Sequence, residues 1–139
     1  MANASETLQL LTDYYAAYGD GGPEGLARMG AFYAEGKTNY TAGTSELSGT
    51  VESPEASLQY LHRLLDLNDN RIEILGTPTI LLAGDAMVAV LLKEKHHGVG
   101  QPELIIPRLC VYEIETGKVT KSFIWQLESE AFDAYYPRA

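Results

Sequence analysis

The chain has 139 residues and a formal net charge of −9, with 45% hydrophobic and 21% charged residues. This composition is typical of a soluble globular protein, and the length predicts a single domain over residues 1–139. The acidic balance argues against nucleic-acid partners and anionic membrane surfaces, because both require a basic footprint on the protein.

Two absences in the sequence bear on location. Residues 1–8 lack the basic and apolar regions of a secretion signal. No apolar run approaches the roughly 20 residues of a membrane span.

The only cysteine, Cys110, lies in an apolar run and is expected to be a buried hydrophobe. We therefore expect a cytoplasmic protein without a disulfide bond within the chain.

Three helices are predicted first. Apolar residues recur there at steps of three and four. Asn3, with Glu6 three residues later, is a typical helix start, and so is Ser53 followed by Pro54. The predicted helices lie between Asn3 and Gly19, between Pro23 and Gly36, and between Ser53 and Asn68.

Strand patterns dominate from residue 72 onward. A short strand over 37–41 and a loop or irregular edge over 42–51 come before them. The later strands are predicted over 72–82, 86–97, 103–115 and 119–128, followed by a short helix that begins near Ser129. Helices followed by an antiparallel meander indicate an α+β domain, with helices on one face of a curved sheet.

The outer face of this sheet is unusually apolar for a surface exposed to water. In the strand over 86–97, Val88 and Leu92 lie on one side, and Met87 and Leu91 on the other. Antiparallel sheets usually leave one face polar. We therefore expect a second copy of the chain to cover the outer face, which gives a homodimer.

Pairing the strands through their turns predicts which polar residues meet. The turn at 98–102 places His96 opposite Leu104 and Leu92 opposite Arg108. The turn at 116–117 places Arg108 opposite Trp125. One face would then gather several polar and aromatic side chains among aliphatic ones, namely Glu94, His96, Arg108, Phe123 and Trp125.

Two interpretations of this group are open. A carboxylate that accepts protons beside an arginine and a histidine could perform general acid–base catalysis, with Glu94, His96 and Arg108 as the catalytic residues. Alternatively, Glu94 and His96 lie at a solvated strand end, with Arg108 in a structural ion pair. The sequence contains no phosphate loop, nucleotide fingerprint or metal-ligand spacing, so neither a cofactor nor a metal is expected.

Phe123 and Trp125 are expected to shape the substrate pocket, and four further residues are candidates for substrate binding. A tyrosine of the first helix, Tyr14 or Tyr18, is placed to donate a hydrogen bond to a ligand oxygen. Asn39 and Tyr40 alternate faces on the short strand, so one of the two should reach the interior.

Four stretches then suggest a family. They are residues 32–35 (FYAE), 48–52 (SGTVE), 112–119 (YEIETGKV) and 124–128 (IWQLE). In their order and spacing the chain resembles the NTF2-like superfamily, particularly its SnoaL-like members, the polyketide cyclases and ketosteroid-isomerase-like proteins. The resemblance implies a cystatin-like cone of helices and curved sheet around a deep apolar pocket. It also implies dimers formed through the outer sheet face.

The catalytic residues of that family carry over only in part. Ketosteroid isomerases use a tyrosine of the first helix, for which Tyr14 or Tyr18 is available, and two pocket aspartates. Residues 86–127 contain no aspartate. The Arg-x-Asp and the later Asp of epoxide-hydrolase relatives correspond to residues 94–96 and to Trp125. In a cyclase of the SnoaL type, Glu94 or His96 would have to move the proton.

We therefore expect an enzyme of the cyclase or isomerase class that needs no cofactor. Its substrate would be a bulky, mostly apolar, oxygen-bearing small molecule of secondary metabolism, of the polyketide or terpenoid type. The alternative is a binding domain or dimeric scaffold that has the same pocket and no catalytic activity.

Overall fold

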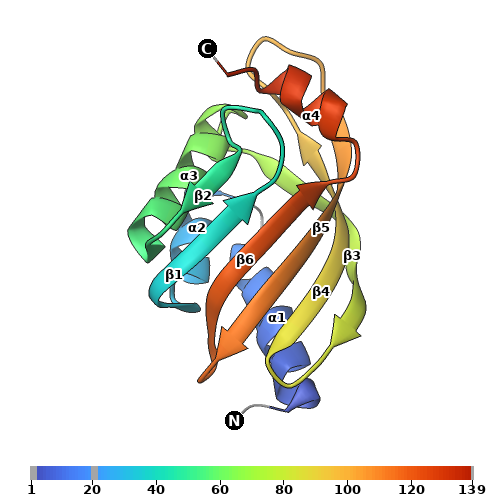
Figure 1. Ribbon diagram of the computed structural model, residues 1–139. Coiled ribbons are helices and arrows are strands. Elements are labelled where there is room, and N and C mark those ends of the chain that lie inside the picture. Colours follow the sequence, from blue (N-terminus) through green and yellow to red (C-terminus); the bar gives the residue numbers. More distant parts are fainter. Residues whose placement is uncertain (1–2, 20–21, 139) are drawn as a thin grey trace.

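A six-stranded curved sheet forms the centre of the computed structural model, which describes residues 3–19 and 22–138 (Figure 1). The strand order is β2-β1-β6-β5-β4-β3. All neighbouring pairs are antiparallel except β1 and β6, which run parallel. The strands are β1 (Tyr33–Thr41), β2 (Gly49–Val51), β3 (Ile72–Ala83), β4 (Met87–His96), β5 (Leu104–Glu115) and β6 (Lys118–Gln126).

Four helices accompany the sheet in the described part of the chain. The first three lie against its inner face, and the last lies near one end of the sheet (Figure 1). This arrangement confirms the predicted α+β cone of helices and curved sheet. The helices are α1 (Ala4–Tyr18), α2 (Pro23–Gly30), α3 (Pro54–Asp66) and α4 (Ser129–Tyr135). None of the helices in the described residues is long and apolar enough to cross a membrane.

The helix starts agree with the capping signals of the sequence. The Asn3 side chain accepts a hydrogen bond from the backbone N–H of Glu6 at 3.0 Å, and Ser53 accepts one from Ala56 at the start of α3. Each cap satisfies a backbone donor that the helix itself leaves unpaired. A close approach of α1 and α2 requires Gly25, because a Cβ atom there would lie 2.1 Å from the carbonyl oxygen of Tyr18.

The second helix is shorter than predicted. It ends at Gly30 instead of Gly36, and β1 already begins at Tyr33. The backbone of Gly36 has φ 76°, and the pairing of β1 with β6 shifts between Tyr33 and Thr38. Beyond this irregularity the strand alternates regularly, so Lys37, Asn39 and Thr41 all point inward and are buried.

The predicted register is right for β4 and β5 and wrong for most of β6. His96 pairs with Leu104 and Leu92 pairs with Arg108, as predicted. On β6, however, Trp125 pairs with Leu109, and Gln126 takes the place opposite Arg108. The pairing shifts after Val119, where Thr120 is an extra residue between two partners of consecutive β5 residues.

This bulge reverses the faces of the rest of β6, as one inserted residue must. Ser122 and Gln126 therefore lie on the buried side. Phe123 and Trp125 lie on the outer face, where their rings stack with centroids 6.1 Å apart. Neither aromatic residue lines the interior, which corrects their predicted role in the pocket.

Candidate functional site

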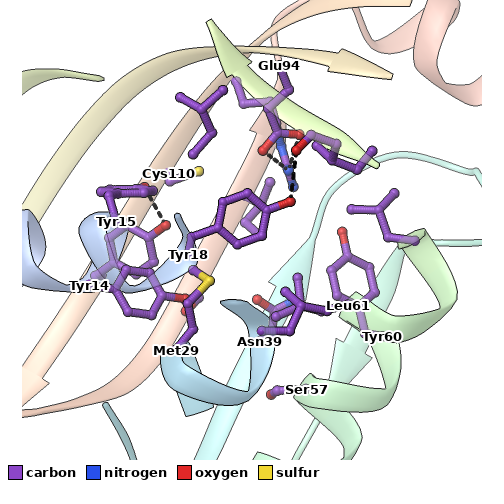
Figure 2. Close-up of a pocket in the computed structure, with 18 of the residues that line it drawn as sticks. Tyr14, Tyr15, Tyr18, Met29, Asn39, Ser57, Tyr60, Leu61, Glu94 and Cys110 are labelled. Atoms are coloured by element: carbon purple, nitrogen blue, oxygen red, sulfur yellow. Dashed lines mark hydrogen bonds and ion pairs between the residues drawn. The ribbon is translucent and has the colours of Figure 1, made fainter. Parts of the chain in front are cut away.

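A cavity of about 70 Å³ lies between the inner face of the sheet and helices α1 to α3 (Figure 2). Most of its wall is apolar or aromatic. Its polar side chains come from six elements, α1, α3, β1, β4, β5 and β6; the one from β6 is Ser122. Five of the residues that the sequence singled out line this cavity: Tyr14, Tyr18, Asn39, Glu94 and Arg108.

A buried ion pair between Glu94 and Arg108 is the main charged feature of the wall. Nη1 of Arg108 lies 2.6 and 2.7 Å from the two carboxylate oxygens of Glu94. The two residues are 8% and 4% exposed. Neighbouring strands β4 and β5 carry them, and their side chains meet diagonally on the inner face. The predicted meeting of these two side chains is therefore present.

The charge state of Glu94 follows from its neighbours. Burial by itself would raise the pKa of this carboxyl, but the charge of Arg108 and the hydrogen bond from His96 lower the pKa to about 2. Glu94 is therefore ionised at neutral pH and is a weak proton acceptor. Its geometry suits it to hold Arg108 in place.

His96 lies behind the ion pair and is not among the residues that line the cavity. It is fully buried, with Nε2 at 2.9 Å from Oε1 of Glu94 and Nδ1 at 2.5 Å from the Tyr136 hydroxyl. Asn68 donates to that hydroxyl at 2.7 Å. A proton on Nε2 of His96 satisfies this chain of hydrogen bonds, since Tyr136 then donates to Nδ1 and His96 donates to Glu94.

The remaining predicted binding residues fall on different sides of the wall. Tyr14 and Tyr18 reach the cavity from α1 (Figure 2). The Tyr14 hydroxyl lies 3.0 Å from that of Tyr33, and Tyr18 donates to the carbonyl of Ile72 at 3.1 Å. Asn39 faces inward, whereas Tyr40 is 39% exposed and does not line the cavity. The alternation of β1 thus selects Asn39 from this pair.

Lys37 is a charged residue of the cavity that the sequence patterns did not predict. It lines the cavity and is only 2% exposed. Its Nζ lies 3.4 Å from Oγ of Ser57 and 4.2 Å from the ring centroid of Tyr33. No carboxylate in the described part of the chain lies within ion-pair distance of this amine. Burial therefore lowers the pKa of Lys37 to about 7.

Three buried polar atoms of the cavity residues have no hydrogen-bond partner among the described residues. They are Nε of Arg108, the hydroxyl of Tyr60 and Oγ of Ser122. Buried polar groups are normally paired, and all three atoms can donate. The wall can therefore bind an oxygen atom of a ligand. Tyr60 was not predicted as part of the site; only the helix that carries it, the third, was predicted.

Three further phenols of the cavity remain protonated at neutral pH. Burial raises the pKa of Tyr14, Tyr15 and Tyr112 well above the usual value. The hydroxyls of Tyr15 and Tyr112 lie 2.6 Å apart and form a hydrogen bond with each other. These side chains give the cavity a polar yet uncharged rim that can hold a neutral ligand.

A surface groove of about 330 Å³ adjoins the cavity and shares Asn39 and Tyr60 with it. The groove is lined by residues of β1, β2 and α3 and of the segment that precedes β2. Asn39 and Tyr60 therefore stand at the boundary between cavity and groove. As for metals, no group of three or more suitable ligands occurs in the residues that the structure describes.

Sequence comparison places the chain in no known family, because neither a protein-family model nor a curated protein matches it significantly. Solved structures do resemble it. An NTF2-like protein from Burkholderia xenovorans LB400 superposes with a TM-score of 0.78 at 19% identity, over 98% of both chains. A candidate polyketide cyclase from Xanthomonas campestris pv. campestris gives 0.74 at 16% identity, over 96% of this chain and 98% of the other.

A third similar structure has a ketosteroid isomerase-like fold. It comes from Catenulispora acidiphila DSM 44928, was solved in complex with trimethylamine, and gives a TM-score of 0.69 at 19% identity. The match covers 94% of this chain and 95% of that one. These similarities confirm the fold that the sequence resemblance implied: the chain has the NTF2-like, or cystatin-like, fold.

Proposed function

We propose that the protein is an enzyme that moves a proton within an oxygen-bearing, mostly apolar small molecule, without a cofactor. The reaction would be an isomerisation or a cyclisation, as in secondary metabolism of the polyketide or terpenoid type. One observation carries this proposal. A buried amine with a pKa near neutrality, Lys37, lines the same cavity as an arginine that has a free donor, Arg108.

In this proposal a carbonyl oxygen of the substrate accepts hydrogen bonds from Nε of Arg108 and from the Tyr60 hydroxyl. The neutral amine of Lys37 removes a proton from the carbon beside the carbonyl. The two donors stabilise the negative charge that develops on the oxygen. Lys37 then returns the proton at another carbon. A base with a pKa near 7 suits this task, because it is partly free at neutral pH and its conjugate acid can still donate.

The roles of Glu94 and His96 change accordingly. The sequence predicts that one of them moves the proton. The low pKa of Glu94 makes its carboxylate a weak base, and His96 does not line the cavity. We propose that both are positioning residues: Glu94 fixes Arg108, and His96 fixes Glu94. Arg108 keeps its expected role of holding a substrate oxygen.

The size of the cavity limits how a bulky substrate could bind. A cavity of about 150 Å³ holds one benzene molecule in an engineered protein, and the cavity here has a volume of about 70 Å³. We propose that the reacting carbonyl and its neighbouring atoms enter the cavity. The rest of the substrate would lie in the adjoining groove, past Asn39 and Tyr60.

A ligand-binding protein or scaffold without catalytic activity is the second candidate. Both carboxylate oxygens of Glu94 are engaged by Arg108, as they would be in an ion pair with a purely structural role. This observation favours the second candidate. The apolar outer face supports a homodimer under either function. Leu91, Leu109 and Trp125 pair across β4, β5 and β6 on that face, and all three are half-buried.

Hydrogen exchange in heavy water separates the two candidates. Small ketones and enones would be incubated with the protein, and loss of the hydrogen beside the carbonyl would be followed by NMR. The enzyme proposal predicts catalysed exchange that falls at least about tenfold in Lys37→Met and is unchanged in Lys93→Met, which alters an exposed lysine. A ligand that binds in the cavity but exchanges at the rate of buffer would support the binding protein.

A further inference from the structure

The amine of Lys37 has neither of the features that usually keep a buried lysine protonated. It has no carboxylate partner among the described residues, and only one side-chain oxygen, Oγ of Ser57, lies within hydrogen-bond range, at the long distance of 3.4 Å. The ring of Tyr33 lies 4.2 Å from Nζ, and this cation–π contact offsets part of the effect of burial. An amine in this setting has a free lone pair at neutral pH, because burial penalises the ammonium form.

Other potential nucleophiles of the cavity are held in unreactive forms. Burial raises the pKa of the Cys110 thiol, so that it remains protonated. The phenols of Tyr14 and Tyr112 remain protonated for the same reason. The carboxylate of Glu94 is engaged by Arg108 and His96. Lys37 is therefore the side chain of this wall that is best prepared to attack a carbon atom.

The wall also offers donors for a carbonyl group. Nε of Arg108 and the hydroxyls of Tyr60 and Ser122 are buried, line the same cavity and have no partner among the described residues. A hydrogen bond to a carbonyl oxygen makes the carbonyl carbon more electrophilic. The cavity thus combines a free amine with donors that activate its natural reaction partner.

We propose that Lys37 is a covalent capture site, which forms a reversible imine with an aldehyde or ketone bound in the cavity. Nζ attacks the carbonyl carbon and gives a carbinolamine. The carbonyl oxygen then leaves as water with the two hydrogens of the amine, and a C=N bond to Nζ remains. No oxidant, reductant or metal is needed.

This inference deepens the proposed function and rests on it for the identity of the pocket, since it names carbonyl compounds as the ligand class. The same free amine acts as a base toward a C–H bond and as a nucleophile toward a carbonyl carbon. Which reaction occurs depends on which ligand atom lies next to Nζ. Aldehydes, which are small and strongly electrophilic, should show the covalent reaction most clearly.

Reductive trapping of the intact protein tests the proposal. Butanal, which is small and straight-chained, would be added at neutral pH with sodium cyanoborohydride, which reduces an imine to a stable secondary amine. Peptide mapping by mass spectrometry would then give the rate of alkylation at each lysine. We expect Lys37 to react at least about tenfold faster than the surface lysines, because a much larger fraction of its amine is unprotonated at pH 7.

Two controls keep the result specific. Lys93 and Lys121 are exposed and supply the internal reference rate. The same reaction in urea, where the pocket is absent, should remove the preference for Lys37. Lys37→Met should lose the fast-reacting site, while Lys93→Met should keep it, and thermal melting would verify that both variants fold.

Alkylation of Lys37 at or below the rate of the surface lysines in the folded protein would overturn the inference. This failure is distinguishable from failure of the proposed function. Trapping with no catalysed hydrogen exchange would leave an amine that captures carbonyl compounds in a protein that is not an isomerase. Catalysed exchange without trapping would leave Lys37 as a base and refute the covalent site.

Discussion

Arg108 contacts both carboxylate oxygens of Glu94 through a single nitrogen, Nη1, at 2.6 and 2.7 Å. The carboxylate therefore does not engage Nε, which is buried and has no partner among the described residues. An arginine held in this way is fixed by its counter-ion while one donor remains for a ligand. Glu94 and Arg108 thus combine a structural ion pair with a binding function, two roles that are alternatives when only the sequence is considered.

Replacing Glu94 by Gln should destabilise the protein. The substitution leaves the buried guanidinium of Arg108 without a counter-ion, and breaking a buried pair in this way typically costs about 3–5 kcal/mol. The cost should be largest at neutral pH and should shrink as the pH falls from about 4.5 toward 2. The reason is that the pKa of Glu94 is lowered on folding: between about 4.5 and 2 the unfolded wild-type chain takes up a proton that the folded protein does not, so the contribution of the ion pair is lost.

Urea unfolding of wild type and Glu94→Gln at several pH values would measure this difference. The double variant Glu94→Gln/Arg108→Met is the matched control, because it removes the unpaired charge as well and should recover part of the loss. A Glu94→Gln protein as stable as wild type at neutral pH would contradict the described ion pair. One that also kept full turnover would contradict the positioning role of Glu94.

Replacing Lys37 by Met should stabilise the protein at neutral pH. The pKa of Lys37 falls from 10.5 in the unfolded chain to about 7 in the folded one. Between these values the unfolded chain binds the extra proton, so the contribution of Lys37 to stability decreases as the pH falls. The stability advantage of Lys37→Met over wild type should therefore shrink as the pH rises from 7 to 10, by up to roughly 1.4 kcal/mol per pH unit.

Unfolding free energies of both proteins across this pH range give the test. Taking the difference between the two proteins cancels the titration of all groups that they share. Lys93→Met serves as the control, since Lys93 is exposed and should give a difference that does not change with pH. A pH-independent difference for Lys37→Met would show that the Lys37 amine is protonated in the folded protein.

Tyr136→Phe should loosen the hydrogen-bond chain behind the site. The hydroxyl bridges Nδ1 of His96 and the side-chain amide of Asn68, and its loss leaves both buried groups with fewer partners. We expect a loss of about 1–3 kcal/mol in stability and a changed NMR signal of the His96 ring. Tyr135→Phe is the comparison, because its hydroxyl donates to the carbonyl of Pro102, away from this chain. An unchanged His96 signal in Tyr136→Phe would contradict the bridge.

Leu109→Glu should prevent dimer formation. Leu109 lies between Leu91 and Trp125 on the outer face, so a carboxylate there would be buried in a homodimer formed through that face. Light scattering coupled to size-exclusion chromatography should show a wild-type dimer and a folded monomeric variant. Leu8→Glu, at an exposed leucine of α1, should leave the dimer intact. A monomeric wild-type protein would refute this interface.

The helices, the long strands and the meeting of Glu94 with Arg108 could be predicted, because capping residues, turns and alternation all agree in those segments. The faces of β6 could not. One extra residue at Thr120 shifts the strand by a single position, and the apolar side chains of Phe123 and Trp125 favoured the wrong face. Two of the three inner residues beyond the bulge, Ser122 and Gln126, are polar, and only Ile124 is apolar, so the hydrophobic pattern favoured the opposite face.

Lys37 was missed for a related reason. A lysine at the start of a short strand is usually solvated, and burial without a counter-ion has no signature in one sequence. Its spacing of two residues from Asn39 was the available signal, since the two must share a face of the strand. The parallel pairing of β1 with β6 brings that face over the cavity, and such a long-range pairing was not evident from local patterns.

The central claim is that the cavity of the folded protein holds an amine of which a substantial fraction is neutral at pH 7. Incorporating isotope-labelled lysine and following each side chain by NMR during a pH titration tests it most directly, with Lys37→Met identifying the signal of Lys37. We predict a pKa of about 7 for Lys37 and values near 10.4 for the exposed lysines. A Lys37 signal that titrates together with those of the exposed lysines would contradict both the base and the covalent capture site.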